Sequence, residues 1–199
     1  MLNSKQLFHS LFESDDIDVK DNVVSINSMH SLHISNFIQE GFQHVADVKE
    51  QTYYEDTNWE LVNYNEQLLF SNHNSWVYVI VEDDTVVKLG ESGQPLAIQG
   101  PRTFMKAGTQ SRFGRLISHG WAHPSSNDTD SRIRGVLKES ASQGKVSLYA
   151  LKCEKVETTY QVLGQERTMY MQVHKDLEKA YLSRLSFTND LPKLNKGLI

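Results

Sequence analysis

The sequence predicts an α+β domain, in which a small antiparallel or mixed β-sheet begins with a β-hairpin and is flanked by helices. The first observation is a pair of β-rich runs at residues 76–81 and 85–89, joined by the short acidic turn Glu82-Asp83-Asp84. The second is a later strand at residues 147–153, followed by another hairpin within 158–171. Together these runs supply enough strands for one small sheet.

The third observation is a set of segments with apolar residues at helical spacing around these strands. One helix is expected over residues 111–119. A second begins near Thr129, Asp130 or Ser131, any of which can cap it. A third is expected over residues 173–185.

The first 75 residues are expected to form an acidic, mainly helical extension ahead of a catalytic domain at residues 76–199. Ser4 can cap a short helix, and a second helix is expected farther on. The apolar residues that predict these two helices are Leu7, Phe8, Leu11 and Phe12, and then Ile34, Phe37, Ile38, Phe42 and Val45. The extension is a candidate for dimer contacts or for a clamp on DNA.

Composition excludes several classes of protein. Of the 199 residues 39% are hydrophobic, as in a globular protein, and no window approaches 18 consecutive apolar residues. The first residues have no apolar core typical of a signal peptide, so a soluble, cytoplasmic protein without a membrane partner is expected. The single cysteine, Cys153, excludes an internal disulfide and a thiolate zinc site.

Charge is distributed unevenly along the chain. The net charge is −5, but residues 1–75 hold 12 acidic and 3 basic residues, whereas residues 76–199 hold 13 acidic and 17 basic ones. The balances are −9 and +4, so the second part is the one that can face phosphates. The basic residues expected to contact DNA are Arg102, Lys106, Arg112, Arg132 and Arg134.

Five short motifs follow one another in residues 76–199. They are Trp76-Val77-Tyr78, Lys88-Leu89-Gly90, Arg115 with His119 four residues later, Leu177-Glu178, and Pro192-Lys193-Leu194-Asn195. In this order, on a hairpin and two helices, they resemble the active site of the GIY-YIG nuclease superfamily. Lys88 stands where the second motif of the family usually has a tyrosine, which is similar to some restriction enzymes of the superfamily.

The resemblance implies a metal-dependent phosphodiester hydrolase acting on double-stranded DNA. Glu178 would bind one Mg²⁺ or Mn²⁺ ion per active site, because a carboxylate is a hard oxygen ligand. Arg115 would place its charged, planar guanidinium on the scissile phosphate.

The resemblance leaves two candidates for the group that activates the attacking water. Tyr78 can orient or deprotonate it, and Lys88 can do so if burial lowers its pKa. An arrangement in which Lys88 lowers the pKa of Tyr78 or of the water is favoured over Lys88 acting alone. His119 would assist proton transfer or contact a phosphate oxygen, and Asn195 would brace the metal or the region of Tyr78.

Three functions remain open. The favoured one is a sequence-specific type II restriction endonuclease that acts as a homodimer and reads bases through residues 92–110 and 121–132. A less specific nuclease of a phage or mobile element, acting in repair or degradation, is the second. A catalytically inactive DNA-binding module is the third.

Other catalytic patterns fit less well. His119 and His123 are four residues apart, but Gly120 and Pro124 interrupt a helix there and no third zinc ligand is evident. The acidic-x-Lys triplets of the commonest restriction-enzyme core occur only in the acidic extension, at residues 18–20 and 47–49.

Overall fold

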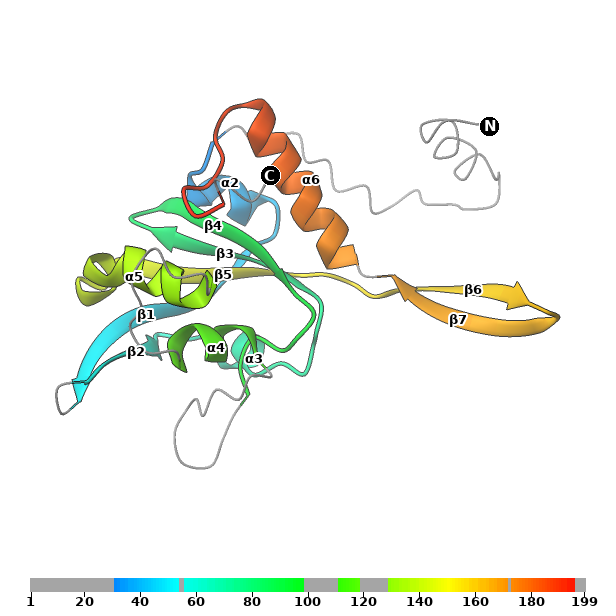
Figure 1. Cartoon of the computed structure of the whole chain (residues 1–199), viewed down its shortest axis with the longest axis horizontal. Helices are drawn as coiled ribbons and strands as arrows, with labels where there is room; N and C mark the ends of the chain where they lie inside the picture. The colour runs from blue at the N-terminus through cyan, green and yellow to red at the C-terminus, as the bar shows by residue number, and fades with distance from the viewer. Residues whose placement is uncertain (1–30, 54–55, 99–110, 119–128, 172, 196–199) are drawn as a thin grey trace.

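The computed structural model describes residues 31–53, 56–98, 111–118, 129–171 and 173–195 (Figure 1). The helices are α2 (Ile34–Gln39), α3 (Glu66–Leu69), α4 (Arg112–Ser118), α5 (Thr129–Ser142) and α6 (Val173–Phe187). The strands are β1 (Gln43–Tyr53), β2 (Asp56–Val62), β3 (Trp76–Glu82), β4 (Thr85–Ser92), β5 (Val146–Lys152), β6 (Val156–Val162) and β7 (Gln165–Met171). The expected α+β class is confirmed.

Five strands form one sheet in the order β2-β1-β5-β3-β4, and every pair in it is antiparallel. Strand β3 lies between β5 and β4 and is buried at every position before its last residue. Such continuous burial is expected of a strand covered on both faces. Strand β4 forms one edge of the sheet, and the site described below lies along it.

Helices cover both faces of this sheet. Residues of α3, α4 and α5, such as Leu69, Phe113 and Leu137, pack on the face that carries Tyr78 and Ile80. Residues of α2 and α6 pack on the opposite face of the sheet. None of the helices in the described part of the chain is long and apolar enough to cross a membrane.

The expected hairpin at residues 76–89 is present as β3 and β4. Its two turn residues, Asp83 and Asp84, have φ angles of 46° and 66°. A turn with two positive φ angles matches the twist of the adjoining strands, which explains a two-residue connection of acidic residues. The later strand and hairpin also occur where expected, as β5 and as β6 with β7.

The expectation of a mainly helical extension is wrong for the described residues 31–53 and 56–75. The helix expected from Ile34 to Val45 ends at Gln39, Gly41 takes a φ of +97°, and β1 follows. Phe42 and Val45 are both buried, but in the cores on opposite faces of the sheet. Their spacing therefore resembles that of a helix, although Val45 lies in a strand. Strand β1 pairs with β5, so this part of the extension completes the sheet of the domain expected at residues 76–199. The helix expected after Ser4 lies outside the described residues.

Strands β6 and β7 form a separate two-stranded ribbon, called the arm here, which projects from the body just before α6 (Figure 1). Side chains alternate between the two faces of a strand. Tyr160 pairs with Arg167 and Tyr170 pairs with Glu157, so the two tyrosines lie on opposite faces of the arm.

Candidate active site

Tyr78 and Lys88 lie on adjacent strands with their side chains on the same face of the sheet. Tyr78 pairs with Gly90, and Lys88 pairs with Ile80, two residues farther along β3. The register shifts after Ile80, because Val81 pairs with Val86 and leaves Val87 as an extra residue in β4. Such a bulge redirects side chains and is common beside active sites. Here it sets the direction of Lys88.

Gly90 is required by the position of Tyr78. A Cβ atom at residue 90 would lie 2.5 Å from Cζ of Tyr78 and closer still to the phenol oxygen. The ring therefore crosses the strand directly over Gly90, and any side chain there would displace it. Burial raises the pKa of Tyr78 above its ordinary value.

A buried ion pair supports the ring of Tyr78. Arg112 of α4 and Asp130 of α5 form a two-bonded pair, with nitrogen-to-oxygen distances of 2.6 and 3.2 Å. The central carbon of the Arg112 guanidinium lies 4.9 Å from the centre of the Tyr78 ring, and Phe113 packs against that ring in a T-shaped arrangement. The pair therefore joins two helices and holds the tyrosine in place.

Arg112 was expected to contact DNA, and the structure gives its guanidinium this internal partner instead. The Arg112 side chain is only 12% exposed and donates two hydrogen bonds to the Asp130 carboxylate, so its main role is to hold the site in place. Asp130 was considered in the sequence only as a possible helix cap. Its side chain is 2% exposed, and only the structure reveals that it is buried against Arg112.

Arg115 lies one helical turn beyond Arg112. Its Nη2 atom is 3.6 Å from Oδ2 of Asp130, and its side chain is 41% exposed. Asp130 thus orients two arginines, one buried beneath Tyr78 and one open to solvent. An accessible guanidinium held from one side is suited to bind a phosphate oxygen.

Lys88 is 5% exposed, and the pKa of its amine is lower than usual. Burial, with smaller contributions from the positive charges of Arg112 and Arg132, lowers the pKa of Lys88 to about 8, although the negative charge of Glu178 opposes the change. Glu178 extends from α6 and is half-buried; burial raises its pKa and the nearby Lys88 opposes that rise. The two side chains are thus electrostatically coupled, and a fraction of Lys88 is neutral near pH 7.

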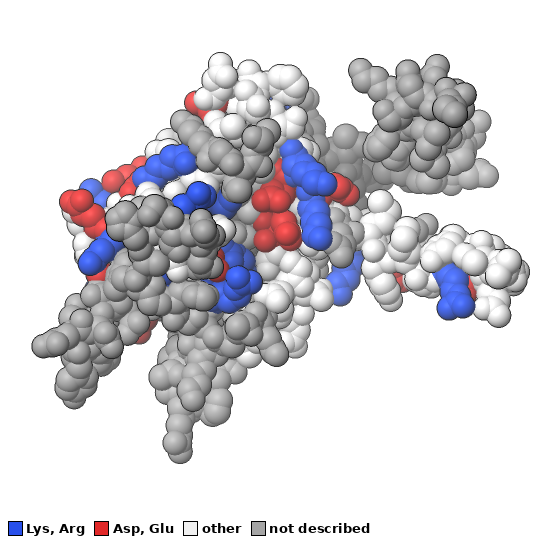
Figure 2. Space-filling model, in the orientation of Figure 1, with Lys and Arg blue, Asp and Glu red and all other residues white. Residues whose placement is uncertain are grey.

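These groups line one open cleft of about 420 Å³. Four of the six expected catalytic residues meet there, namely Tyr78, Lys88, Arg115 and Glu178, together with Arg112, Asp130 and Glu91. Basic and acidic side chains lie side by side near the base of the arm in Figure 2. The expectation that Tyr78 and Lys88 converge with Arg115 and Glu178 is confirmed as geometry, whereas their chemical roles stay predictions. His119 lies outside the described residues.

Asn195 is not in this cleft. Its Oδ1 accepts from the Leu89 N–H at 2.8 Å, and its Nδ2 donates to the Leu89 carbonyl at 2.9 Å. Leu194 also donates its N–H to Val87. The C-terminal segment therefore hydrogen-bonds to the edge of β4 on both sides of Lys88, at Val87 and at Leu89. Asn195 was expected to brace the metal or Tyr78, and the structure shows that it braces the strand that carries Lys88 and Gly90.

The remaining basic residues differ in their availability to DNA. Arg134 is fully buried, donates to the Ile117 carbonyl at 3.0 Å and lies over the ring of Trp59, so it is not at a DNA-binding surface. This corrects the expectation, which counted Arg134 with Arg132 among the residues that contact DNA. Arg132 is half-buried and bonds the Leu194 carbonyl near the cleft. Arg102 and Lys106 lie outside the described residues.

The fit of a metal ion depends on the carboxylates of this cleft. Glu91 raises the pKa of Glu178 further by its negative charge, a repulsion that a divalent cation would relieve. Among the described residues no group of three or more His, Cys, Asp or Glu converges to hold a metal. A closed zinc site is therefore absent from that part of the chain, whereas Mg²⁺, which keeps most of its water ligands, suits Glu178.

Comparison with known proteins adds one structural similarity. No protein-family model matches the chain, and no curated protein matches it. A solved structure of the restriction endonuclease HPY188I in complex with product DNA is similar with a TM-score of 0.37 and 17% identity. The similarity covers 81% of this chain and 84% of that one. The function of the chain is therefore inferred from the residues of its own cleft.

Proposed function

We propose that this protein is a metal-dependent endonuclease that hydrolyses phosphodiester bonds of double-stranded DNA, with an active site of the GIY-YIG type. The observation that supports the proposal is the convergence of Tyr78, Lys88, Arg115 and Glu178 on one cleft. The cleft combines a lysine that is partly neutral near pH 7, an accessible arginine and a carboxylate. These are a base, a phosphate ligand and a metal ligand.

The lowered pKa of Lys88, together with its place in the cleft, supports it as the base. Hydrolysis joins a water oxygen to phosphorus and breaks the bond from phosphorus to one bridging oxygen. A neutral Lys88 amine would accept the proton of the attacking water, because its pKa of about 8 is close to the working pH. Tyr78, whose pKa burial raises, is the weaker candidate and would orient the water. This differs from the arrangement favoured on sequence alone, in which Lys88 lowers the pKa of Tyr78 or of the water.

Arg115 would stabilise the negative charge that grows on the non-bridging oxygens as the water attacks. Asp130 holds this guanidinium in place from its buried side. A Mg²⁺ ion bound by Glu178 would add positive charge at the same phosphate. The departing oxygen would take a proton from solvent, to which the cleft is open.

Within this class we propose a type II restriction endonuclease that acts as a homodimer. Two-fold assemblies suit palindromic sites, because each subunit can cut one strand. Of the segments expected to read bases, 92–110 and 121–132, the described residues Ser92, Gly93, Gln94, Thr129 and Asp130 line the cleft. Residues 1–30 are proposed to contribute to the dimer or to hold DNA.

Incubation of a long plasmid with the protein and Mg²⁺ tests the proposal and its alternatives. Discrete bands support a sequence-specific endonuclease, and a smear supports a nuclease of low specificity. Intact plasmid across pH 6–9, with Mg²⁺ and with Mn²⁺, contradicts the enzymatic function. The Glu178→Gln variant, purified in parallel, identifies any contaminating nuclease.

A further inference from the structure

A second and larger cavity adjoins the catalytic cleft. Its volume is about 670 Å³, and it shares Glu91, Gly93 and Gln94 with the cleft. Its other wall is formed by the base of the arm, with Glu157 and Tyr170, and by Lys155 and Lys175. The two hollows therefore make one continuous groove, which runs from the reacting centre along the end of β4 to the arm.

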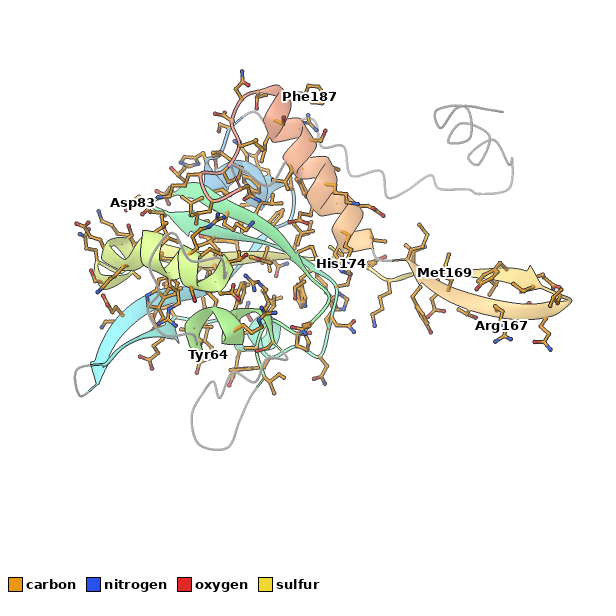
Figure 3. All side chains as sticks on the ribbon, in the orientation of Figure 1. Tyr64, Asp83, Arg167, Met169, His174 and Phe187 are labelled. Atoms are coloured by element: carbon orange, nitrogen blue, oxygen red, sulfur yellow. The ribbon has the colours of Figure 1, made fainter. Side chains whose placement is uncertain are left out.

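The floor of this groove is fixed by buried polar side chains. Oγ of Ser75 lies 2.9 Å from Nδ1 of His174, and Nε2 of His174 lies 3.3 Å from Oε2 of Glu91. Ser75 and His174 are each 4% exposed. His174 lies near the start of α6, where the arm joins the body (Figure 3). The Ser75–His174 hydrogen bond joins the start of β3 to α6, and Glu91 at the end of β4 lies beside the same ring, so the floor of the groove is preformed.

The groups above this floor are suited to a nucleic-acid strand. Tyr170 is 60% exposed and belongs to the otherwise polar face of the arm, opposite the face that carries Tyr160. Exposed aromatic rings stack on bases without regard to sequence. Lys155 and Lys175 are both exposed and can bind phosphates, and the amides of Asn74 and Gln94 can hydrogen-bond to base edges.

We infer that this groove receives one strand of the DNA whose scissile phosphate lies in the cleft, with Tyr170 stacked on a base and the two lysines on the backbone. The inference rests on the proposed nuclease function and adds a substrate-binding site outside the catalytic residues. Cavities of about 300–1,000 Å³ hold ligands of the size of a nucleotide. The shared wall at Glu91 and Gly93 is the reason to assign the same strand to both hollows. The arm then acts as one side of the DNA-binding surface.

The test compares two tyrosines of the same arm. Full-length protein is titrated against a fluorescent DNA duplex in EDTA, where no cleavage occurs, and the change in polarisation gives the Kd. Tyr170→Ala is expected to weaken binding about tenfold or more, because a stacked base is lost. Tyr160→Ala, on the opposite face and 45% exposed, is the matched control and is expected to change Kd less than twofold. Unchanged thermal unfolding of both variants shows that the body is intact.

The lysines give an independent readout in the salt dependence of binding. Lys175→Met and Lys155→Met should each reduce the slope of log Kd against log salt by about 0.9, as expected for one lost phosphate contact. Lys145→Met, whose side chain pairs with Asp83 at the far end of the hairpin, should leave the slope unchanged.

The outcomes separate the inference from the function. If the wild-type protein binds DNA and Tyr170→Ala binds as tightly as Tyr160→Ala, the groove does not hold a strand, although the nuclease proposal survives. If the wild-type protein binds no DNA, both the groove inference and the proposed nuclease function are contradicted. If Tyr170→Ala binds DNA more weakly but both lysine variants keep the wild-type salt slope, the assignment of Lys155 and Lys175 to the phosphate backbone is overturned.

Discussion

The buried amine of Lys88 predicts how the cleavage rate depends on pH. With a pKa of about 8, about one tenth of Lys88 is neutral at pH 7 and half is neutral at pH 8. If this neutral amine is the base, the rate at saturating DNA should rise about tenfold per pH unit below pH 8 and then level off. The assay is the initial rate of Mg²⁺-dependent cleavage between pH 6 and 9 at fixed ionic strength.

Two variants assign the base. Lys88→Arg stays charged at every pH and should lose about 10²- to 10⁴-fold in rate. Tyr78→Phe keeps the ring in its packed position over Gly90 and should retain the greater part of the activity and the same pH profile. An active Lys88→Arg enzyme beside an inactive Tyr78→Phe enzyme would refute this reasoning and return the role to the phenol.

The stability of a Lys88 variant shows whether it is inactive because the base is missing or because the protein is unfolded. The pKa of Lys88 falls from 10.5 to about 8 on folding, so the unfolded chain binds this proton more tightly. Burial of the charged amine therefore lowers the free energy of unfolding. This loss of stability is fully present below pH 8 and disappears as the pH rises to 10.5. Its size is about 3 kcal/mol, since one pKa unit corresponds to about 1.4 kcal/mol. Lys88→Met should therefore be inactive yet more stable by up to about 3 kcal/mol at pH 7, with a smaller gain at pH 10, as measured by urea unfolding.

Three further changes test the parts that position the site. Arg115→Lys should lower the rate about 10²-fold or more with a smaller effect on DNA affinity, because a point charge cannot replace the planar fork; equal losses in rate and affinity would mark a simple phosphate anchor. Gly90→Ala should cost about 1–3 kcal/mol in urea unfolding, because its Cβ would overlap Tyr78, and the double variant Gly90→Ala/Tyr78→Ala should lose less than the two single costs combined. Asn195→Ala should destabilise the protein by about 2–4 kcal/mol, because it leaves the buried N–H and carbonyl of Leu89 without partners, and an unchanged unfolding curve would show that water replaces the amide.

The elements that the sequence predicted well are those determined by local patterns. The Glu82-Asp83-Asp84 connection between two β-rich runs specifies a hairpin, and it occurs in the structure. The helical spacing in residues 173–185 likewise specifies α6. The spacing around Phe42 and Val45 misled, because the two side chains pack on opposite faces of the sheet and a register shift between His44 and Ala46 interrupts the alternation of β1.

The site was predictable only in part for a similar reason. Tyr78, Lys88, Arg115 and Glu178 stand in recognisable motifs, and the structure brings them to one cleft. The buried role of Asp130 depends on how α5 packs against α4, a long-range contact that no local spacing encodes. The same packing buries Arg134, whereas Arg132, two residues earlier, is half-buried. Charge along the sequence therefore overestimated the number of arginines available to DNA.

The most direct test of the central claim is the cleavage of one DNA by wild-type protein and by Glu178→Gln under identical conditions. Wild-type protein with Mg²⁺ should produce discrete fragments with the same ends in every digest. Glu178→Gln should bind the DNA with nearly unchanged affinity and produce no fragments, because it loses the proposed metal ligand and keeps the basic surface. Mg²⁺-dependent cutting by Glu178→Gln at the wild-type rate would contradict the assignment of the active site.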